Sequence, residues 1–134
     1  MKNHILIIDD EWINRELYKE FLIPYGYRVS MAKDGEEGLE MAFTSEPDII
    51  LLDIRLPKIS GCKIYELLKN DSATKDIPIL VISALYSKAN IKNECTLIPQ
   101  KDIYIKPLHH KEIKERIDVI LGRGTKKVMV KTNG

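Results

Sequence analysis

The chain lacks the long apolar run of a membrane-spanning helix, since none of its hydrophobic stretches approaches ~18 residues. Its N-terminal apolar run is too short for a signal peptide. It also lacks an excess of either charge: 21 basic and 20 acidic side chains leave a net charge of +1. No overall field would therefore draw it to nucleic acid or to an anionic membrane. We expect a cytoplasmic protein that binds neither of them directly.

Cysteine and histidine are scarce. The two cysteines, Cys62 and Cys95, make neither a disulfide framework nor a zinc site. We expect two reduced thiols, as is usual in cytosolic proteins. His4, His109 and His110 do not follow the apolar runs that could form a metal site, and we expect all three to be surface residues. The chemistry of this chain should therefore rest on oxygen ligands.

A glycine-rich phosphate loop is also missing, because Asp9-Asp10-Glu11-Trp12 follows the first apolar run. This disfavours a nucleotide-binding fold.

With 134 residues the chain is long enough for one domain and not for two. We expect that domain to span residues 1–121, followed by a flexible tail at 122–134 that has several lysines and no helical stripe.

Five short runs rich in Ile, Leu and Val predict strands, and helical patterns separate them. The expected strands are 5–8, 27–32, 48–53, 78–83 and 103–107. The expected buried stripes are Ile13, Leu17 and Phe21; Leu39, Ala42 and Phe43; Ile64, Leu67 and Leu68; and Ile113, Ile117, Ile120 and Leu121. Asp34 and Glu37 form a helix N-terminal signal. Residues 85–101 carry only a weak stripe of Ile91, Cys95, Leu97 and Ile98.

Repetition of a strand and a helix predicts an α/β fold with a parallel sheet and right-handed crossovers. The first, third and fourth strands are almost wholly apolar and should be central. Polar residues interrupt the second and fifth, which should be edges. The doubly wound, flavodoxin-like order 2-1-3-4-5 satisfies both conditions.

Polar side chains end four of these strands: Asp9 and Asp10 the first, Asp53 the third, Ser83 the fourth and Lys106 the fifth. In a parallel sheet these ends lie on one edge. Three converging carboxylates repel each other unless a cation joins them, and oxygen ligands favour Mg²⁺. A metal-bound carboxylate beside an ammonium and a hydroxyl suits phosphoryl transfer, with the carboxylate as nucleophile.

The segments ILIIDDE, DGEEGLE, PDIILLDIRLPKISG, IPILVISA and YIKPL resemble the receiver domain of two-component response regulators. The resemblance spans nearly all of residues 4–121. It implies that Asp53 accepts the phosphoryl group. Asp10, Asp53 and the backbone carbonyl of Arg55 would bind Mg²⁺, with Asp9 acting mainly through water. It further implies that Ser83 and Lys106 contact the phosphoryl group and that the Lys106-Pro107 bond is cis.

The implied partners are a sensor histidine kinase or a histidine phosphotransfer protein upstream, and an unidentified protein downstream. We expect no enzyme activity beyond self-phosphorylation and self-dephosphorylation. One alternative is a pseudo-receiver that is never phosphorylated, although it should lack an acid, the acceptor or the lysine. A phosphohydrolase would need a second acid close after the nucleophile, where Arg55 stands.

The chain departs from the receiver pattern near its fifth strand. Pro99-Gln100-Lys101 stands where a Gly-Ala pair usually leads into that strand, and Ile103 replaces the usual aromatic residue. Tyr104 lies one residue later, on the opposite face of the strand. These departures concern the expected output surface and not the phosphorylation site.

Overall fold

The computed structural model describes residues 3–83, 95–106 and 109–123, and it contains one five-stranded parallel sheet within them. The strand order is β2-β1-β3-β4-β5, as predicted. The strands are β1 (His4–Ile8), β2 (Arg28–Ala32), β3 (Ile49–Asp53), β4 (Ile79–Ser83) and β5 (Ile103–Ile105). The α-helices are α1 (Trp12–Leu22), α2 (Gly35–Ser45), α3 (Gly61–Lys69) and α5 (His110–Ile120), with 3₁₀ turns at Ile23–Tyr25 and Gln100–Asp102.

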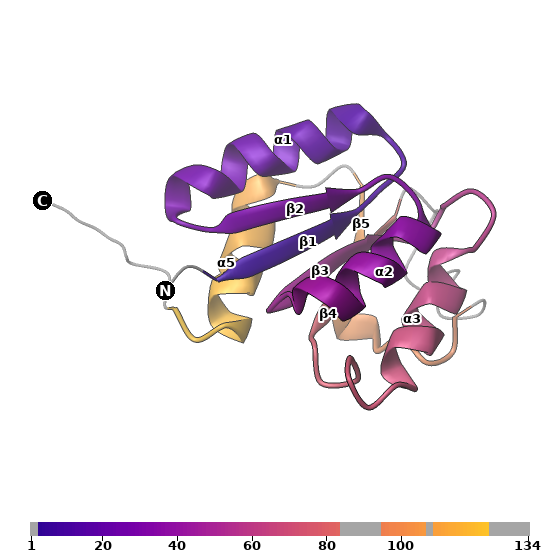
Figure 1. Ribbon diagram of the computed structural model, residues 1–134. Helices are drawn as coiled ribbons and strands as arrows, with labels where there is room; N and C mark the ends of the chain where they lie inside the picture. Colours follow the sequence, from indigo (N-terminus) through magenta and orange to yellow (C-terminus); the bar gives the residue numbers. More distant parts are fainter. Residues whose placement is uncertain (1–2, 84–94, 107–108, 124–134) are drawn as a thin grey trace, which may run out of the picture.

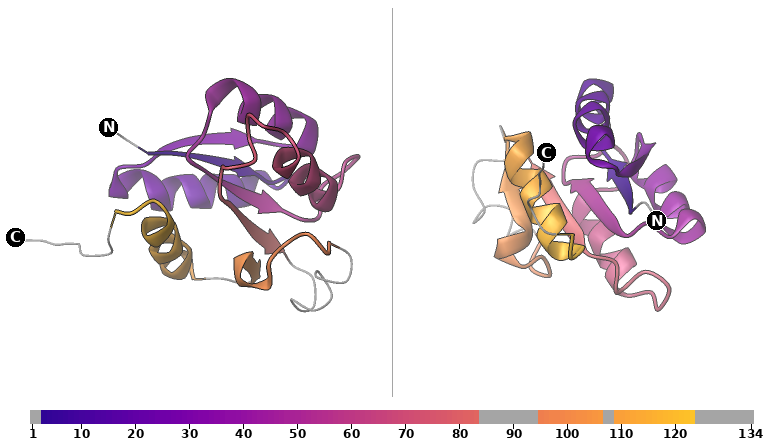
Figure 2. Two further views of the ribbon diagram at one scale, coloured as in Figure 1. Left: turned by 90° about the horizontal axis from the view of Figure 1, so that it is seen from below. Right: turned by 90° about the vertical axis from the view of Figure 1, so that its left-hand side faces the viewer.

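The sheet lies between two helical layers (Figures 1 and 2). Helices α1 and α5 cover one face, and α2 and α3 cover the other. Alternate residues along each central strand enter opposite clusters: Leu6 and Ile8 pack toward α2 and α3, whereas Ile5 and Ile7 pack toward α1 and α5. The two-sided burial explains the continuous apolar runs of β1, β3 and β4, which are buried throughout.

The edge strands are more exposed than the central ones, as predicted. On β5, Ile103 and Ile105 face the α2/α3 cluster, and Tyr104 packs against the α1/α5 cluster. The alternation predicted for these three residues is therefore confirmed. The proposed cis bond before Pro107 lies outside the described residues.

The predicted stripe of α1 is wrong at Ile13 and Leu17, whereas Phe21, its third residue, packs against the α1/α5 cluster as predicted. Ile13 and Leu17 are 56% and 45% exposed, whereas Tyr18 and Leu22 are buried. The physical reason is the polar anchoring of the helix: Asn14 and Arg15 turn toward the end of β1, which leaves Ile13 and Leu17 facing solvent.

Two other helices depart from their predicted stripes in the same way. In α2, Ala42 is buried but Phe43 is 42% exposed, since Gly38 brings the helix close to Ile8 of β1 and Gly35 brings it close to Ile64 of α3. In α3, Ile64 and Leu68 are buried as predicted, and Tyr65 is buried in place of Leu67. The N-terminus of α2 is confirmed, since Asp34 accepts a hydrogen bond from the Glu37 amide at 2.8 Å.

The expectation of two reduced thiols is wrong for this structure, in which Cys62 and Cys95 form a disulfide. Cys62 lies in the first turn of α3, and Cys95 lies on the segment that leads to β5. Their Cα atoms are 5.4 Å apart although 33 residues separate them in sequence. Only the packing of α3 beside that segment brings them together, and cysteine spacing carries no information about that packing.

His4 is also placed differently from the expectation. It is 3% exposed, and its Nε2 lies 2.6 Å from the Ser30 hydroxyl on the neighbouring strand. Burial is the main cause that lowers the pKa of this imidazole below its usual value. His4 therefore joins β1 to β2 inside the protein, while His109 is exposed as expected.

The C-terminal end of α5 is tied to the loop before β2. Arg123 donates a hydrogen bond to the Tyr25 carbonyl at 3.0 Å and lies over the Tyr27 ring. The rest of the tail predicted at 122–134 falls on residues 124–134, outside the described part, so that domain boundary stays a prediction.

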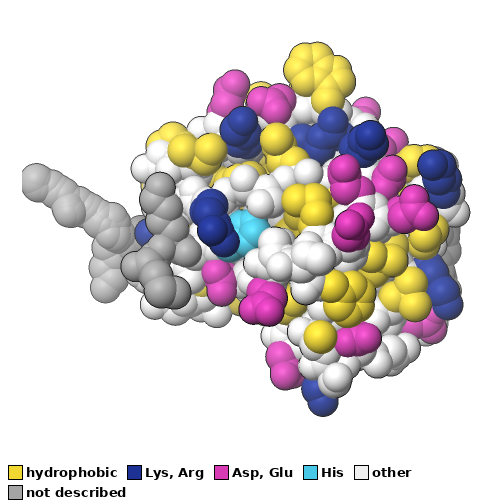
Figure 3. Space-filling view, in the orientation of Figure 1, with side chains coloured by type: hydrophobic (Ala, Val, Ile, Leu, Met, Phe, Trp, Pro, Cys, Tyr) yellow, Lys and Arg dark blue, Asp and Glu magenta, His cyan; other side chains and the backbone are white. Residues whose placement is uncertain are grey.

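No helix among the described residues is long and apolar enough to cross a bilayer. Acidic and basic side chains are interspersed on the face seen in Figure 3, in keeping with the near-zero net charge.

Candidate functional site

The carboxyl ends of β1 and β3 bring two buried aspartates together. Asp53 is the last residue of β3, and Asp9 directly follows β1, its neighbour in the sheet. Asp9 is 3% exposed and Asp53 6%. Each carboxylate has one short backbone hydrogen bond: the Glu11 amide donates to Asp9 at 2.9 Å, and the Arg55 amide donates to Asp53 at 3.0 Å. These bonds fix the two carboxylates at the edge of the sheet.

Asp10 completes an acidic cluster with these two residues. One carboxylate oxygen from each of Asp9, Asp10 and Asp53 lies within 4.8 Å of the others. Asp10 is exposed, so the cluster opens to solvent on its side. The sequence prediction that three carboxylates converge here is confirmed by this geometry. Oxygen-only ligands with an open side fit a hard divalent cation that retains waters.

Lys106 supplies positive charge beside the two inner acids of the cluster. Its Nζ is 3.5 Å from one carboxylate oxygen of Asp9 and 3.5 Å from one of Asp53. The Lys106 amide donates a 2.7 Å hydrogen bond to the Ser83 carbonyl, which fixes the start of the loop after β5. The lysine thus bridges the acids at distances too long for strong hydrogen bonds.

Burial dominates the electrostatics of the two inner acids. Desolvation raises the pKa of Asp53 to about 6, although the Arg55 amide and the Lys106 ammonium both favour its ionised form. Desolvation likewise raises the pKa of Asp9, against the Glu11 amide and Lys106. One lysine therefore does not offset the cost of two buried carboxylates. A site of this kind favours additional positive charge.

Ser83 ends β4 and is fully buried. Its strand pairs with β3 on one side, where Ile82 lies opposite Asp53, and with β5 on the other, where Ser83 lies opposite Ile105. The predicted hydroxyl is therefore located between the strand that ends in Asp53 and the strand that leads to Lys106.

Two polar residues of α1 that were not predicted from the sequence support the cluster. Asn14 donates to Asp9 Oδ2 at 3.4 Å and to Glu11 at 2.7 Å. Arg15 donates to the Asp9 carbonyl at 2.7 Å. Both lie in the first turn of a helix that starts right after the acidic pair. That spacing is the one signal that could have indicated their return to the cluster.

Arg55 lies on the loop that leaves β3, and its side chain is exposed. Together with Asp10, Ser60 and Cys62 it lines a pocket of about 680 Å³ beside the acidic cluster. Asp10 is the member of the acidic cluster that lines this pocket, so the pocket opens beside the exposed side of the cluster.

The family model described as the response regulator receiver domain matches residues 5–118. The chain belongs to the response regulator receiver family. The flavodoxin-like strand order fits this membership, since solved receivers share it.

The chain is similar to two kinds of curated response regulator. The chain is 35% identical over 125 residues to the probable transcriptional regulator ycf27 of Guillardia theta, and the match covers 93% of this chain and 48% of that protein. It is 31% identical over 90 residues to the polar-differentiation response regulator DivK of Brucella anthropi, covering 67% of this chain and 73% of that protein. The chain thus spans about half the length of the ycf27 regulators.

Solved receivers have the same fold. A response regulator from Chloroflexus aurantiacus aligns with a TM-score of 0.82 at 29% identity, over 92% of this chain and 100% of that one. The receiver domain of a sensor histidine kinase from Pseudomonas aeruginosa aligns with a TM-score of 0.80 at 24% identity, over 91% and 99%. That structure is described with a magnesium ion coordinated in its active site cleft.

Proposed function

We propose that this receiver accepts a phosphoryl group on Asp53 and signals through altered protein contacts. The observation that carries the proposal is the pairing of buried Asp53 with Lys106 at 3.5 Å inside an acidic cluster open to solvent. A carboxylate oxygen of Asp53 attacks phosphorus, and the bond from phosphorus to the donor breaks as the acyl phosphate forms.

The residues of the cluster fit Mg²⁺, which would be held by Asp10, Asp53 and the Arg55 backbone carbonyl, with Asp9 acting through water. When bound, the ion supplies charge neutralisation for the carboxylates and for the incoming phosphoryl oxygens. Two buried acids of raised pKa and an oxygen-only ligand set support this assignment.

Lys106 and Ser83 would hold the phosphoryl group in place. The Lys106 ammonium lies close enough to Asp53 to pair with a phosphoryl oxygen by a small adjustment. The Ser83 hydroxyl, at the end of the strand next to β3, would donate to a second oxygen. These residues position and neutralise the group, which is most of what phosphoryl transfer requires of a protein.

The expected donor is the phosphohistidine of a sensor kinase or of a histidine phosphotransfer protein in the cytoplasm. Beyond its own phosphorylation and dephosphorylation, the chain would turn over no substrate. The downstream partner is a protein, and direct contact with nucleic acid or membrane is not part of the proposal.

The deciding experiment is incubation of the purified chain with a small phosphodonor, such as acetyl phosphate, followed by intact-mass measurement. We expect one added phosphoryl group with Mg²⁺ and none when the ion is removed by a chelator. A protein that gains no mass with Mg²⁺ present would instead match the alternative, a phosphorylation-independent pseudo-receiver.

Mg²⁺ is expected to raise the melting temperature of the protein, because a ligand that binds only the folded state stabilises it by mass action. Asp10→Asn should weaken Mg²⁺ binding about tenfold, or about 1.4 kcal/mol, since it removes one charged ligand. Thermal melts across a Mg²⁺ titration measure both effects. The exposed Asp76→Asn is the matched control and should keep the wild-type titration. Equal affinity in Asp10→Asn and wild type would refute the role of Asp10 as a ligand.

Phosphorylation is expected to shift the loop after Ser83 and residues 85–101 without an aromatic exchange on β5. Residues 84–94 of this segment lie outside the described part of the chain. Ile103 is fully buried and has a stiff branched side chain, and Tyr104 packs against the opposite cluster. Tyr104 cannot reach the α2/α3 face without a change of register. Aromatic NMR spectra with and without beryllofluoride, a phosphoryl mimic, test this. A Tyr104 ring that moves to the space behind Ser83 would contradict it.

A further inference from the structure

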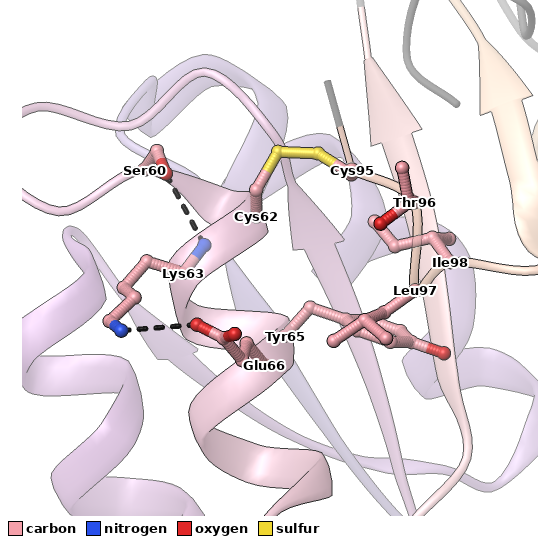
Figure 4. A pocket seen from close by; sticks show the side chains of 9 residues that line it. All are labelled: Ser60, Cys62, Lys63, Tyr65, Glu66, Cys95, Thr96, Leu97 and Ile98. Atoms are coloured by element: carbon pink, nitrogen blue, oxygen red, sulfur yellow. Dashed lines mark hydrogen bonds and ion pairs between the residues drawn. A yellow bond between two sulfur atoms is a disulfide. The ribbon is translucent and has the colours of Figure 1, made fainter. Parts of the chain in front are cut away.

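The disulfide between Cys62 and Cys95 has no part in the proposed phosphorylation chemistry. Figure 4 shows it at one end of a pocket lined by residues of α3 and of the segment before β5. The pocket has a volume of about 260 Å³ and is separate from the acidic cluster. Tyr65 of α3 and Leu97 of the facing segment lie along its other end.

One end of the bridge is coupled to the backbone of the acceptor. Cys62 follows Gly61, whose amide donates to the Ile54 carbonyl at 2.8 Å. A Cβ on Gly61 would lie 2.5 Å from the Asp53 carbonyl oxygen, so α3 begins in direct contact with the residue that ends β3. Cys62 also lines the pocket beside the acidic cluster. Only Gly61 lies between Cys62 and the contact of α3 with the Asp53 backbone, so a shift of Cys62 should also shift that contact.

The other end of the bridge, Cys95, lies on the segment that leads into β5 and on to Lys106. Cys95 is 5% exposed, and Ile98, close after it, is fully buried in the α2/α3 core. The bridge thus fastens residues 95–102 to α3. It links α3, which begins beside Asp53, to the segment that leads through β5 to Lys106.

The two sulfur atoms differ in access. Cys62 is partly exposed and lines both pockets, whereas Cys95 is buried. A thiolate from solvent can therefore attack the Cys62 sulfur and displace the Cys95 sulfur into the pocket. The N-terminal turn of α3, in which Cys62 lies, favours negative charge at Cys62 once the bridge is open.

We infer that Cys62–Cys95 is a reversible thiol–disulfide exchange site whose substrate is a dithiol reductant, and that its oxidised form restrains the response to phosphorylation. The reductant thiolate bonds to the Cys62 sulfur as the bridge breaks, and its second thiolate then releases Cys62. Two electrons and two protons pass to the protein, which gains two thiols, and the reductant becomes a disulfide. Disulfides in cytosolic proteins are mostly of this transient kind.

The coupling part of this inference rests on the proposed function. If acceptance of a phosphoryl group moves the segment that leads from Cys95 to β5, the bridge opposes that movement. Linkage then requires the reverse effect: a phosphorylated site favours the open dithiol. Phosphorylation and reduction should therefore promote each other.

The first arm of the test counts thiols. The chain contains only these two cysteines, so alkylation under denaturing conditions reports the bridge directly. We expect no adduct on protein purified without reductant, two adducts after dithiothreitol, and a return to none after exposure to oxidised glutathione. Two adducts before reduction, or a bridge that native protein does not open in dithiothreitol, would overturn the inference.

The second arm measures coupling through beryllofluoride binding in the presence of Mg²⁺. We expect at least threefold tighter binding by the reduced protein than by the oxidised one. Cys62→Ser should bind like the reduced form, and dithiothreitol should not change it. Because Cys62 is partly exposed, this variant is expected to fold, and Cys62→Ala provides a second check.

The outcomes separate the inference from the function on which it rests. Equal affinities in the oxidised and reduced forms would overturn the coupling and leave the proposed function intact. Failure of both forms to bind beryllofluoride or to gain a phosphoryl group would contradict the proposed function and the coupling together. In that case the thiol count still decides whether the exchange site exists.

Discussion

Asp53→Asn is expected to abolish phosphorylation by a small phosphodonor with Mg²⁺ present. The amide is nearly the same size as the carboxylate, but its oxygen carries no full negative charge and is a poor nucleophile for phosphorus. Asp53 is 6% exposed at the end of β3, and the Lys106 Nζ lies 3.5 Å from its carboxylate. Asp9 is similarly buried and lies at the same distance from Lys106, so this variant tests which of the two carboxylates is the acceptor. Intact mass should show one phosphoryl group on wild type and none on the variant.

Two control variants distinguish loss of the acceptor from the loss of another charged side chain. Asp76→Asn removes an exposed carboxylate away from the cluster and should be phosphorylated like wild type. Lys106→Met keeps Asp53 but removes the pairing ammonium, and it should gain the phosphoryl group more slowly. Equal labelling of Asp53→Asn and wild type would rule out Asp53 as the sole acceptor.

The same substitution should change how stability depends on pH without metal. Burial raises the pKa of Asp53 from 3.8 to about 6, so between these values the folded protein holds more protons than the unfolded chain. The free energy of unfolding then falls as pH rises through this window, by up to about 3 kcal/mol for this group. Asp53→Asn removes that contribution. It should therefore stabilise the metal-free protein above pH 6 relative to wild type, as urea unfolding at pH 4 and pH 7 would measure.

The site could be predicted from sequence because it depends on strand ends. Asp9, Asp53 and Lys106 each follow a short apolar run, and the parallel topology brings those ends to one edge. Composition separated central strands from edge strands, and this fixed the neighbours of β3. The order of polar residues along the chain was therefore enough to predict their convergence.

Helix orientation could not be predicted in the same way. Ile13 and Leu17 have helical spacing, but the rotation of α1 follows from the bonds of Asn14 and Arg15 to Asp9. In α2 the close contact is made by Gly38, which has no side chain to contribute to a hydrophobic pattern. Periodicity identifies a helix, but tertiary contacts decide which of two competing faces is buried.

The disulfide could not be predicted from the sequence, because it too depends on tertiary contacts. Cys62 and Cys95 approach because α3 packs beside the connection to β5, and the weak pattern of residues 85–101 did not predict a path for that connection. The prediction of two reduced thiols rested only on the general rarity of disulfides in cytosolic proteins.

Gly61→Ala is expected to destabilise the protein by about 3 kcal/mol, which is large for a single methyl group. The added Cβ would lie 2.5 Å from the Asp53 carbonyl oxygen and 2.5 Å from the Ile54 Cα. Both are backbone atoms at the end of a central strand, so neither can rotate away as a side chain does. The α3 helix would have to move off β3, which would also break the 2.8 Å hydrogen bond from the Gly61 amide to Ile54.

Gly35→Ala is the matched control, because it adds the same methyl group to the first residue of another helix. There the nearest atoms are the Cδ1 and Cγ1 of Ile64, at 2.7 and 3.0 Å, which a change of rotamer can move. The better helix propensity of alanine, about 1 kcal/mol, offsets part of that cost. Urea unfolding of both variants in reducing buffer should show a much larger loss for Gly61→Ala. If the two losses are equal, the close approach of α3 to Asp53 is not what requires glycine at position 61.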